Sequence, residues 1–160
     1  ITGGEPTLQK DLPEFCRKVK NKGYKIKLDT NGTNPKMLKQ IADEELVDYI
    51  AMDLKHSLNE YNWLADGEHE SNMRKSIKII LNSGLEHEFR TTVIPSIHNP
   101  ETIRNIAKEI PQANHYYIQN FRPNVVYDES FSEKRRFTDE ELAEMKFKAE
   151  EYVSEVKIRN

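Results

Sequence analysis

The sequence has very little cysteine. Only Cys16 is present among 160 residues. A disulfide framework needs cysteines in pairs, and a metal centre built on thiolates needs several of them at close spacing. The sequence therefore excludes an internal disulfide and a cysteine-held metal cluster within this chain, and we expect no residue of the chain to be a metal ligand.

Long apolar runs and blocks of one charge are also absent. No apolar segment approaches the roughly 18 residues that suggest a membrane span, and the first residues resemble no secretory signal. The 24 basic and 27 acidic residues are mixed along the chain, a pattern that gives no support to nucleic-acid binding. We therefore expect a cytoplasmic protein with neither a membrane nor a nucleic-acid partner.

The composition favours one folded domain over residues 1–160. Hydrophobic residues make up 36% and charged residues 32% of the chain, which suits a hydrophobic core under a well-solvated surface. The chain begins at Ile1 without an initiator methionine. We therefore expect the start to be a truncation or a processed boundary.

Helical and strand periodicities alternate along the chain without a linker between them. Residues 9–22 place Leu12, Phe15 and Cys16 at helical spacing before Gly23, and residues 24–30 alternate apolar residues with lysines as a strand does. Cap signals at Asn34 and at Asn99 predict further helices. A further helix is expected from residue 71 or 72 to 83, and another begins at Thr138, where the sequence has a capping box. The other expected strands are 47–54, 88–95, 116–121 and 156–159. Residues 122–137 are expected to form a loop.

Strands that are separated by one helix each favour parallel pairing through right-handed crossovers. The predicted fold class is therefore α/β, with an open parallel sheet or a partial (βα) barrel. In such folds the working residues lie at the carboxyl ends of the strands. Polar clusters follow or end successive predicted strands, and we expect them to share one rim: 3–6, 29–32, 53–55, 90–92 and 119–122.

Three of these clusters carry motifs. Thr2-Gly3-Gly4-Glu5-Pro6-Thr7 resembles the GGEP motif of the radical S-adenosylmethionine (SAM) superfamily, and the agreement continues through Leu28-Asp29-Thr30-Asn31-Gly32 and Met52-Asp53-Leu54-Lys55. The chain is most similar there to activating enzymes of glycyl radical enzymes, of the anaerobic ribonucleotide reductase activating type, with pyruvate formate-lyase activase as a relative. The resemblance covers nearly the whole chain and implies a partial radical SAM barrel whose N-terminal strands and cluster loop are missing.

The resemblance implies a SAM site at the rim. The backbone of Gly3-Gly4 and the carboxylate of Glu5 would hold the methionine ammonium, assisted by Asp29, and Lys55 would pair with the methionine carboxylate. Asp53 would lie near the ribose hydroxyls or a monovalent cation, and Arg90 would line the substrate side. Arg122 stands where the pyruvate formate-lyase activase pattern has a histidine. The expected cofactor-binding residues are Gly3, Gly4, Glu5, Pro6, Asp29, Asn31, Asp53, Lys55, Arg90 and Arg122.

The resemblance also implies an oxidoreductase that uses radical chemistry. A 4Fe-4S cluster on a CxxxCxxC segment before the GGEP motif would cleave SAM reductively, and the 5'-deoxyadenosyl radical would take a hydrogen atom from a glycine of a partner enzyme. Flavodoxin or ferredoxin would donate the electron. The sequence holds no such cysteine segment, and Cys16 lies on an apolar helix face. We therefore assign the cluster to a full-length parent and expect this chain alone to be inactive, with no catalytic residue of its own.

Two other functions compete with this hypothesis. In the first, the full-length parent is a radical SAM enzyme that acts on a small molecule, such as a 7-carboxy-7-deazaguanine synthase. In the second, the chain is a noncatalytic ligand-binding fragment. An open groove favours a protein substrate, and a closed pocket with purine-specific groups favours a small molecule. Asp29 and Asp53 also have a plainer interpretation as caps of turns.

Two further groups of residues receive ordinary interpretations. The five histidines lack tight metal-ligand spacing, so we expect surface or ordinary polar roles for them. We expect the basic triplet at 134–136 to be a solvated loop. His56 follows Lys55 and is the histidine closest to the rim; the others are His69, His87, His98 and His115.

The single cysteine makes a direct prediction about cluster assembly. Anaerobic incubation of the chain with ferrous iron and sulfide will leave no stoichiometric cluster, because a 4Fe-4S cluster takes its ligands from several thiolates. Iron analysis and visible absorption measure the outcome, and a Cys16→Ala variant will give the same trace. A stoichiometric cluster that cleaves SAM reductively would contradict the prediction.

Overall fold

The computed structural model describes residues 1–61, 69–123, 131 and 133–160. Five parallel strands form one sheet in the order β1-β2-β3-β4-β5. The strands are β1 (Lys27–Thr30), β2 (Tyr49–Asp53), β3 (Glu86–Val93), β4 (His115–Asn120) and β5 (Val156–Arg159). The helices are α1 (Leu12–Lys20), α2 (Pro35–Asp43), α4 (His69–Asn82), α5 (Pro100–Glu109) and α6 (Asp139–Ala149), with 3-10 turns η1 (Pro6–Leu8) and η2 (Leu58–Glu60).

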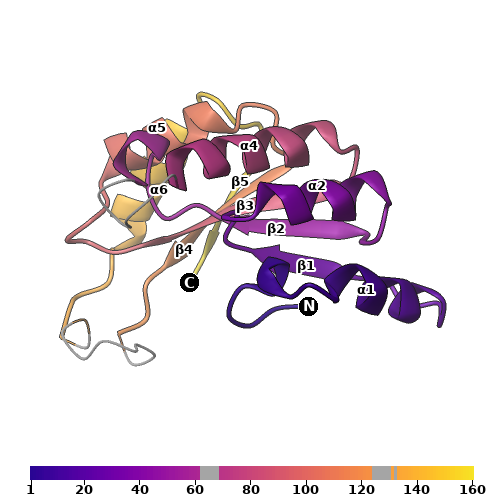
Figure 1. Ribbon diagram of the computed structural model, residues 1–160. Helices are drawn as coiled ribbons and strands as arrows, with labels where there is room; N and C mark the ends of the chain where they lie inside the picture. Colours follow the sequence, from indigo (N-terminus) through magenta and orange to yellow (C-terminus); the bar gives the residue numbers. More distant parts are fainter. Residues whose placement is uncertain (62–68, 124–130, 132) are drawn as a thin grey trace.

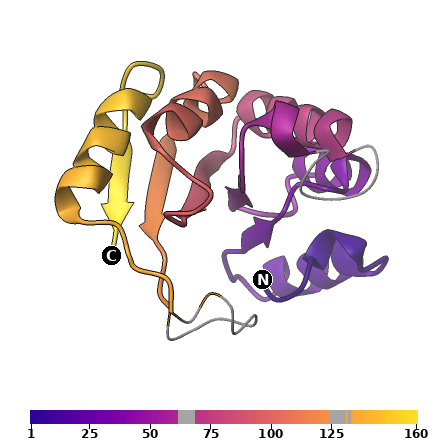
Figure 2. The same ribbon diagram turned by 90° about the vertical axis from the view of Figure 1, so that its left-hand side faces the viewer.

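The helices lie on one side of the sheet. Figures 1 and 2 show α2, α4, α5 and α6 packed along one face, with the strands curving beneath them and α1 beside β1 at the edge. Because strand order follows sequence order, each crossover adds the next strand to the same edge. The predicted α/β class with parallel pairing is confirmed, and the curved open sheet agrees with a partial barrel.

The two faces of the sheet differ in chemistry because side chains alternate along a strand. On the helix side lie fully buried apolar residues, among them Leu28, Ile50 and Phe89. No described helix covers the other face, which we call the inner face (Figure 2). The inner face carries the charged and aromatic residues that alternate with these apolar ones along the strands: Lys27, Asp29, Tyr49, Asp53, Glu88, Arg90, Tyr117 and Arg159.

The start of the chain extends the edge of the sheet beside β1. The amino group of Ile1 donates to the carbonyl of Lys27 at 2.6 Å, and the N–H of Asp29 donates to the carbonyl of Ile1 at 2.9 Å. This pair of bonds has the pattern of a parallel ladder. Ile1 therefore brings the Gly3-Gly4 turn next to the carboxyl end of β1.

The predicted helix caps are confirmed at three positions. The amide oxygen of Asn34 accepts from Met37 N–H, that of Asn99 accepts from Thr102 N–H, and Thr138 forms both bonds of a capping box. The predicted start of α4 at residue 71 or 72 is wrong. The helix is already formed at His69, and an ion pair between Glu70 and Arg74, one helical turn apart, stabilises the additional turn.

Some strand limits and burial predictions are also wrong. The first strand, predicted at 24–30, begins only at Lys27, because the carboxylate of Asp48 accepts a hydrogen bond from the N–H of Ile26 at 2.7 Å. Tyr24 lies outside the strand and is 66% exposed. Phe15, predicted on the apolar helix face, is 51% exposed. The third strand begins two residues before the predicted 88, since Glu86 already pairs with Tyr49. The second, predicted at 47–54, spans Tyr49–Asp53, and the fourth, predicted at 116–121, spans His115–Asn120.

Two of the histidines are buried rather than at the surface. His87 is 4% and His98 is 5% exposed, and each ring nitrogen of both has a backbone partner. The predicted loop at 122–137 lies partly outside the described residues, and its described part contains no α-helix or strand. Within the described ranges no helix is both long enough and apolar enough to span a bilayer.

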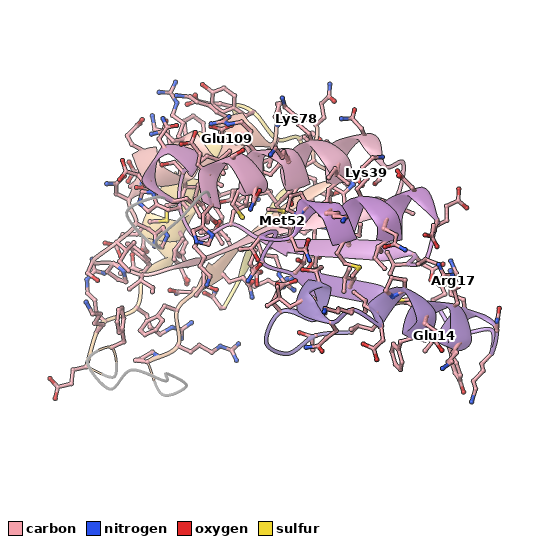
Figure 3. All side chains as sticks on the ribbon, viewed as in Figure 1. Glu14, Arg17, Lys39, Met52, Lys78 and Glu109 are labelled. Carbon is pink, nitrogen blue, oxygen red and sulfur yellow. The ribbon has the colours of Figure 1, made fainter. Side chains whose placement is uncertain are left out.

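Gly32 marks a close approach between the loop after β1 and the sheet. Its φ is +76°, and a Cβ there would lie 2.1 Å from Cε of Met52 on β2, a residue labelled in Figure 3. The hydroxyl of Ser76 on α4 donates to the carbonyl of Gly32 at 2.7 Å. The loop, β2 and α4 therefore pack tightly at this point.

We predict that Gly32→Ala lowers the free energy of unfolding by roughly 3 kcal/mol, from about 1 kcal/mol of left-handed backbone strain plus overpacking against Met52. The matched control is Gly84→Ala, because Gly84 has φ +72° but no atom within 4 Å of the added carbon. That variant will lose only the backbone part, about 1 kcal/mol. Urea unfolding measures both, and equal losses would contradict the close approach.

Candidate functional site

Charged residues of three neighbouring strands meet on the inner face near the carboxyl ends of the strands. The register places Asp53 of β2 beside Arg90 of β3, and Nε of Arg90 donates to Oδ1 of Asp53 at 2.7 Å. The same guanidinium lies 3.4 Å from Oδ1 of Asp29 on β1 and 3.7 Å from Oε1 of Glu88. Three of the predicted site residues, Asp29, Asp53 and Arg90, are therefore brought together.

One carboxylate oxygen in this cluster has no hydrogen-bond partner. Oδ1 of Asp29 is buried and accepts no hydrogen bond, although it lies within ion-pair distance of Arg90. A buried acceptor without a donor is costly, since it has lost its hydration. Oδ1 of Asp29 is therefore stabilised by the charge of Arg90 alone, and the side chain, which is 25% exposed, is a candidate to accept a donor from a ligand.

Burial and charge act in opposite directions on Arg90. Burial disfavours its charged form, but the hydrogen bond to Asp53 and the nearby carboxylates of Asp29 and Glu88 outweigh it and raise the pKa of Arg90 above its ordinary value. A guanidinium can serve several carboxylates because its donors are fixed in a planar fork. Arg90 is therefore a permanent cation that links β1, β2 and β3.

Glu88 is a buried member of the cluster that the sequence did not reveal. Its side chain is 3% exposed and accepts from Lys27 Nζ at 3.0 Å, Tyr49 Oη at 3.0 Å and Arg159 at 3.1 Å. Burial works against its ionisation, but the bonds from Lys27, Arg159 and Tyr49 prevail and lower the pKa of Glu88. The sequence signal that could have identified Glu88 was its spacing, because it precedes Arg90 by two residues on one strand and so lies on the same face of the sheet.

The Gly3-Gly4 turn is open, and the residue after it fastens the turn to the sheet. Gly3 and Gly4 have φ of +96° and +55°, and nothing lies within 4 Å of a Cβ built on either. The carboxylate of Glu5 accepts from Thr7 N–H and Oγ1, Thr30 Oγ1 and Asn31 N–H. Glu5 therefore ties the turn to the end of β1, and Pro6 begins η1 as a buried residue.

Glu5 retains some capacity for a ligand. Its Oε1 accepts three of these hydrogen bonds and its Oε2 accepts one, from Asn31 at 2.6 Å. A carboxylate oxygen has two lone pairs, so Oε2 is able to accept a second donor. Asn31 uses its own side-chain oxygen to accept from Thr33 N–H and Oγ1, which orders the loop.

A cavity of about 290 Å³ lies beside this cluster. It lies beyond the ends of β2 and β3 and is mostly apolar away from the charged residues. In the part of the chain that the structure describes, the ammonium of Lys55 makes no hydrogen bond or ion pair. The lining residues are Asp53, Leu54, Lys55, Arg90, Thr92, Ile94, Ile97 and His98.

A second hollow adjoins the cavity at Thr92 and extends to β5. Its volume is about 640 Å³. Arg122, the last predicted site residue, lies here just beyond β4 and donates to the carbonyl of Asn160 at 2.6 Å. The hollow is lined by Thr92, Gln119, Asn120, Phe121, Arg122, Arg159 and Asn160. The two hollows share Thr92, and we refer to them together as the groove.

Among the described residues, the remaining titratable side chains give no metal site. Across residues 1–61, 69–123, 131 and 133–160 no three or more histidine, cysteine, aspartate or glutamate side chains are placed to hold a metal ion. Cys16 is buried in α1, away from the groove residues, and burial raises the pKa of its thiol. Near the carboxyl ends of β1 and β2 the protein instead combines the carboxylates of Asp29 and Glu5 with the ammonium of Lys55, which has no described partner, and this set of groups suits a zwitterionic ligand.

Known proteins resemble this chain in sequence and in fold. A sequence profile described as the radical SAM superfamily matches residues 1–110. Two proteins of Methanocaldococcus jannaschii bear the provisional name glycyl-radical enzyme activating enzyme. One is 38% identical over 165 residues, which cover 99% of this chain and 69% of that protein. The other is 35% identical over 113 residues, 68% of this chain and 43% of that protein.

The fold is similar to the crystal structure of a domain of pyruvate-formate lyase-activating enzyme from Bacteroides vulgatus. The TM-score is 0.78, with 100% of this chain and 97% of that domain covered. At 15% sequence identity this likeness concerns the fold alone. It agrees with the curved parallel sheet and its single layer of helices.

The lowered pKa of Glu88 predicts how its contribution to stability depends on pH. Glu88→Gln will lower the free energy of unfolding at pH 7 by roughly 2 kcal/mol, because hydrogen bonds to a charged group are lost. A carboxyl whose folded pKa lies below the unfolded value of about 4.3 stabilises the fold fully above that pH. The difference between wild type and variant will therefore shrink as the pH falls below about 4.

Urea unfolding at several pH values measures this difference. Glu86→Gln is the matched control, because Glu86 is exposed on the same strand, and it will change stability by less than about 0.5 kcal/mol. A Glu88→Gln effect that stays constant down to pH 3 would show that ionisation of Glu88 is not what stabilises the inner face.

Proposed function

Because the chain belongs to the radical SAM superfamily, we propose that it is the SAM-binding part of an enzyme that activates glycyl radical enzymes. The observation that carries the proposal is the meeting of three motifs far apart in sequence. Glu5 is hydrogen-bonded to Asn31, and Arg90 links Asp29 to Asp53. The names of the two M. jannaschii relatives support the activating role.

The residues at the rim fit SAM. Its methionine end carries an ammonium and a carboxylate, and its ribose carries hydroxyl groups. The partly exposed carboxylate of Asp29 and the remaining lone pair of Glu5 Oε2 suit the ammonium, and the free ammonium of Lys55 suits the carboxylate. The bare backbone of Gly3-Gly4 permits close approach. Asp53 beside the 290 Å³ cavity is our candidate for the ribose hydroxyls.

The residues do not fit a 4Fe-4S cluster. Such a cluster takes three cysteines in this superfamily, and the sequence has only Cys16, which is buried in α1. We therefore assign to this chain the binding and orientation of SAM and substrate. Generation of the radical, with flavodoxin or ferredoxin as electron donor, belongs in this proposal to a longer cytoplasmic parent.

The open inner face favours a protein substrate over a small molecule. In the described part of the chain helices cover only one side of the sheet (Figure 2), and the 640 Å³ hollow continues the groove towards β5. A glycine loop of a partner enzyme is an extended segment that such a groove admits. A synthase for a small molecule needs a closed pocket with groups specific for its substrate.

The proposal predicts that the chain binds SAM and that Lys55→Ala weakens the affinity about tenfold, since a charge-assisted hydrogen bond is lost. Asp29→Asn will weaken it by a similar factor. Lys78→Ala is the control, because Lys78 is exposed on α4 on the far side of the sheet from the groove (Figure 3). Isothermal titration calorimetry measures the three variants against wild type.

A second measurement separates the two substrate classes. With SAM present, a peptide that copies the glycine loop of a glycyl radical enzyme will protect the ends of β4 and β5 from hydrogen exchange, and a purine will not. Protection by the purine alone would favour the small-molecule alternative. Wild-type chain that does not bind SAM, or equal affinity in the Lys55, Asp29 and Lys78 variants, would overturn the proposed site.

A further inference from the structure

The main chain just after β2 is held by buried side chains from other segments. The N–H of Lys55 donates to Oη of Tyr61 at 2.6 Å, and the carbonyl of Lys55 lies 2.9 Å from Nε2 of His98. Tyr61 comes directly after η2, and His98 precedes α5. Both are buried, at 7% and 5% exposure. Side chains 6 and 43 positions further along the chain therefore hold the main chain of Lys55 at its N–H and at its carbonyl.

The preceding residue is fixed in the same way. The N–H of Leu54 donates to the carbonyl of Arg90 at 2.7 Å, and the carbonyl of Leu54 accepts from Thr91 Oγ1 at 2.7 Å. The hydroxyl of Tyr116 in turn donates to Thr91 at 2.8 Å. All four main-chain polar groups of Leu54 and Lys55 are thus paired, although the strand ladder with β3 ends at Asp53.

The contacts of His98 define its tautomer. Its Nδ1 accepts from the N–H of Ile94 at 3.0 Å and so carries no proton. Its Nε2 must then carry the proton in order to donate to the carbonyl of Lys55. A neutral ring is required, and burial, which lowers the pKa of His98, favours that form. The site uses His98 as a fixed donor.

The side chain of Lys55 contrasts with its main chain. It is exposed and has no described partner, and a lysine side chain alone carries about 2 kcal/mol of rotamer entropy. Fixing the Cα and the direction of the Cα–Cβ bond limits the space that the ammonium explores. Affinity is gained when a binding group is ordered before the ligand arrives.

We propose that His98 is a positioning residue of the SAM site, which acts through the carbonyl of Lys55 and requires a neutral donor at the Nε2 position. This inference rests on the proposed function, since Lys55 is there the partner of the methionine carboxylate. His98 lines the 290 Å³ cavity, but its two ring nitrogens are both occupied by protein. Its effect on the ligand is therefore indirect.

Three variants test the proposal by calorimetric titration with SAM. His98→Phe keeps the ring volume without the donor and will weaken binding about tenfold, the effect of one lost hydrogen bond. His98→Gln restores a donor near Nε2 and will bring the affinity to within about threefold of wild type. His87→Phe is the matched control, because His87 is equally buried with both nitrogens bonded, but it lies at the opposite end of the sheet.

A double variant separates positioning from general damage to the fold. If His98 acts through Lys55, the variant that combines His98→Phe with Lys55→Ala will bind SAM no more weakly than Lys55→Ala alone. Circular dichroism at the titration temperature confirms that each variant is folded. Independent, multiplying losses, or equal losses in the His98 and His87 variants, would overturn the positioning role.

The outcomes for the two proposals are distinct. Wild-type affinity in His98→Phe, with a clear loss in Lys55→Ala, refutes only the positioning role. Absence of SAM binding in the wild-type chain refutes the proposed function and the positioning role with it.

Discussion

The ion-pair network around Arg90 is the interaction on which the inner face depends. A parallel sheet usually has both faces covered and apolar, whereas this sheet places carboxylates of β1, β2 and β3 side by side on a face that no described helix covers. Asp29, Asp53 and Glu88 would repel one another without a shared cation. Arg90 lies within 4 Å of all three, and Lys27 and Arg159 complete the neutralisation of Glu88. The charges thereby become a fixed scaffold, because each is held by partners on other strands of the sheet.

This scaffold distinguishes the polar groups that are bonded within the protein from those that we propose for the ligand. Glu88 uses its carboxylate, Arg90 its Nε–H group and Glu5 most of its carboxylate for hydrogen bonds within the protein. The groups that remain accessible are the partly exposed carboxylate of Asp29, the bare Gly3-Gly4 backbone and the ammonium of Lys55. They converge from three motifs on one end of the sheet. A ligand with its own ammonium and carboxylate matches these carboxylate, backbone and ammonium groups. SAM is therefore the ligand that we propose for this member of the superfamily.

Local patterns in the sequence predicted most of the fold. Helix caps at Asn34, Asn99 and Thr138 depend on residues within three positions of one another, and each formed as expected. The alternation of strand and helix led to parallel pairing, which the sheet confirms. The error in the first strand arose from a partner distant in sequence. Asp48 captured the N–H of Ile26 and shortened β1, and the fold left Tyr24 and Phe15 exposed although the local pattern placed them inside.

The sequence by itself determined the α/β class, the family and the positions of the motifs, because these depend on spacing along the chain and on residue type. It also determined that this chain carries too few cysteines for a cluster. Only the tertiary structure decided which side chains the protein uses for itself. Glu88 became a buried anion and His98 a fixed donor because strand register and loop packing join residues as much as 71 positions apart. Hydrogen-bond partners at such separations leave no periodic signal in the sequence, so their roles emerge only when the chain is folded.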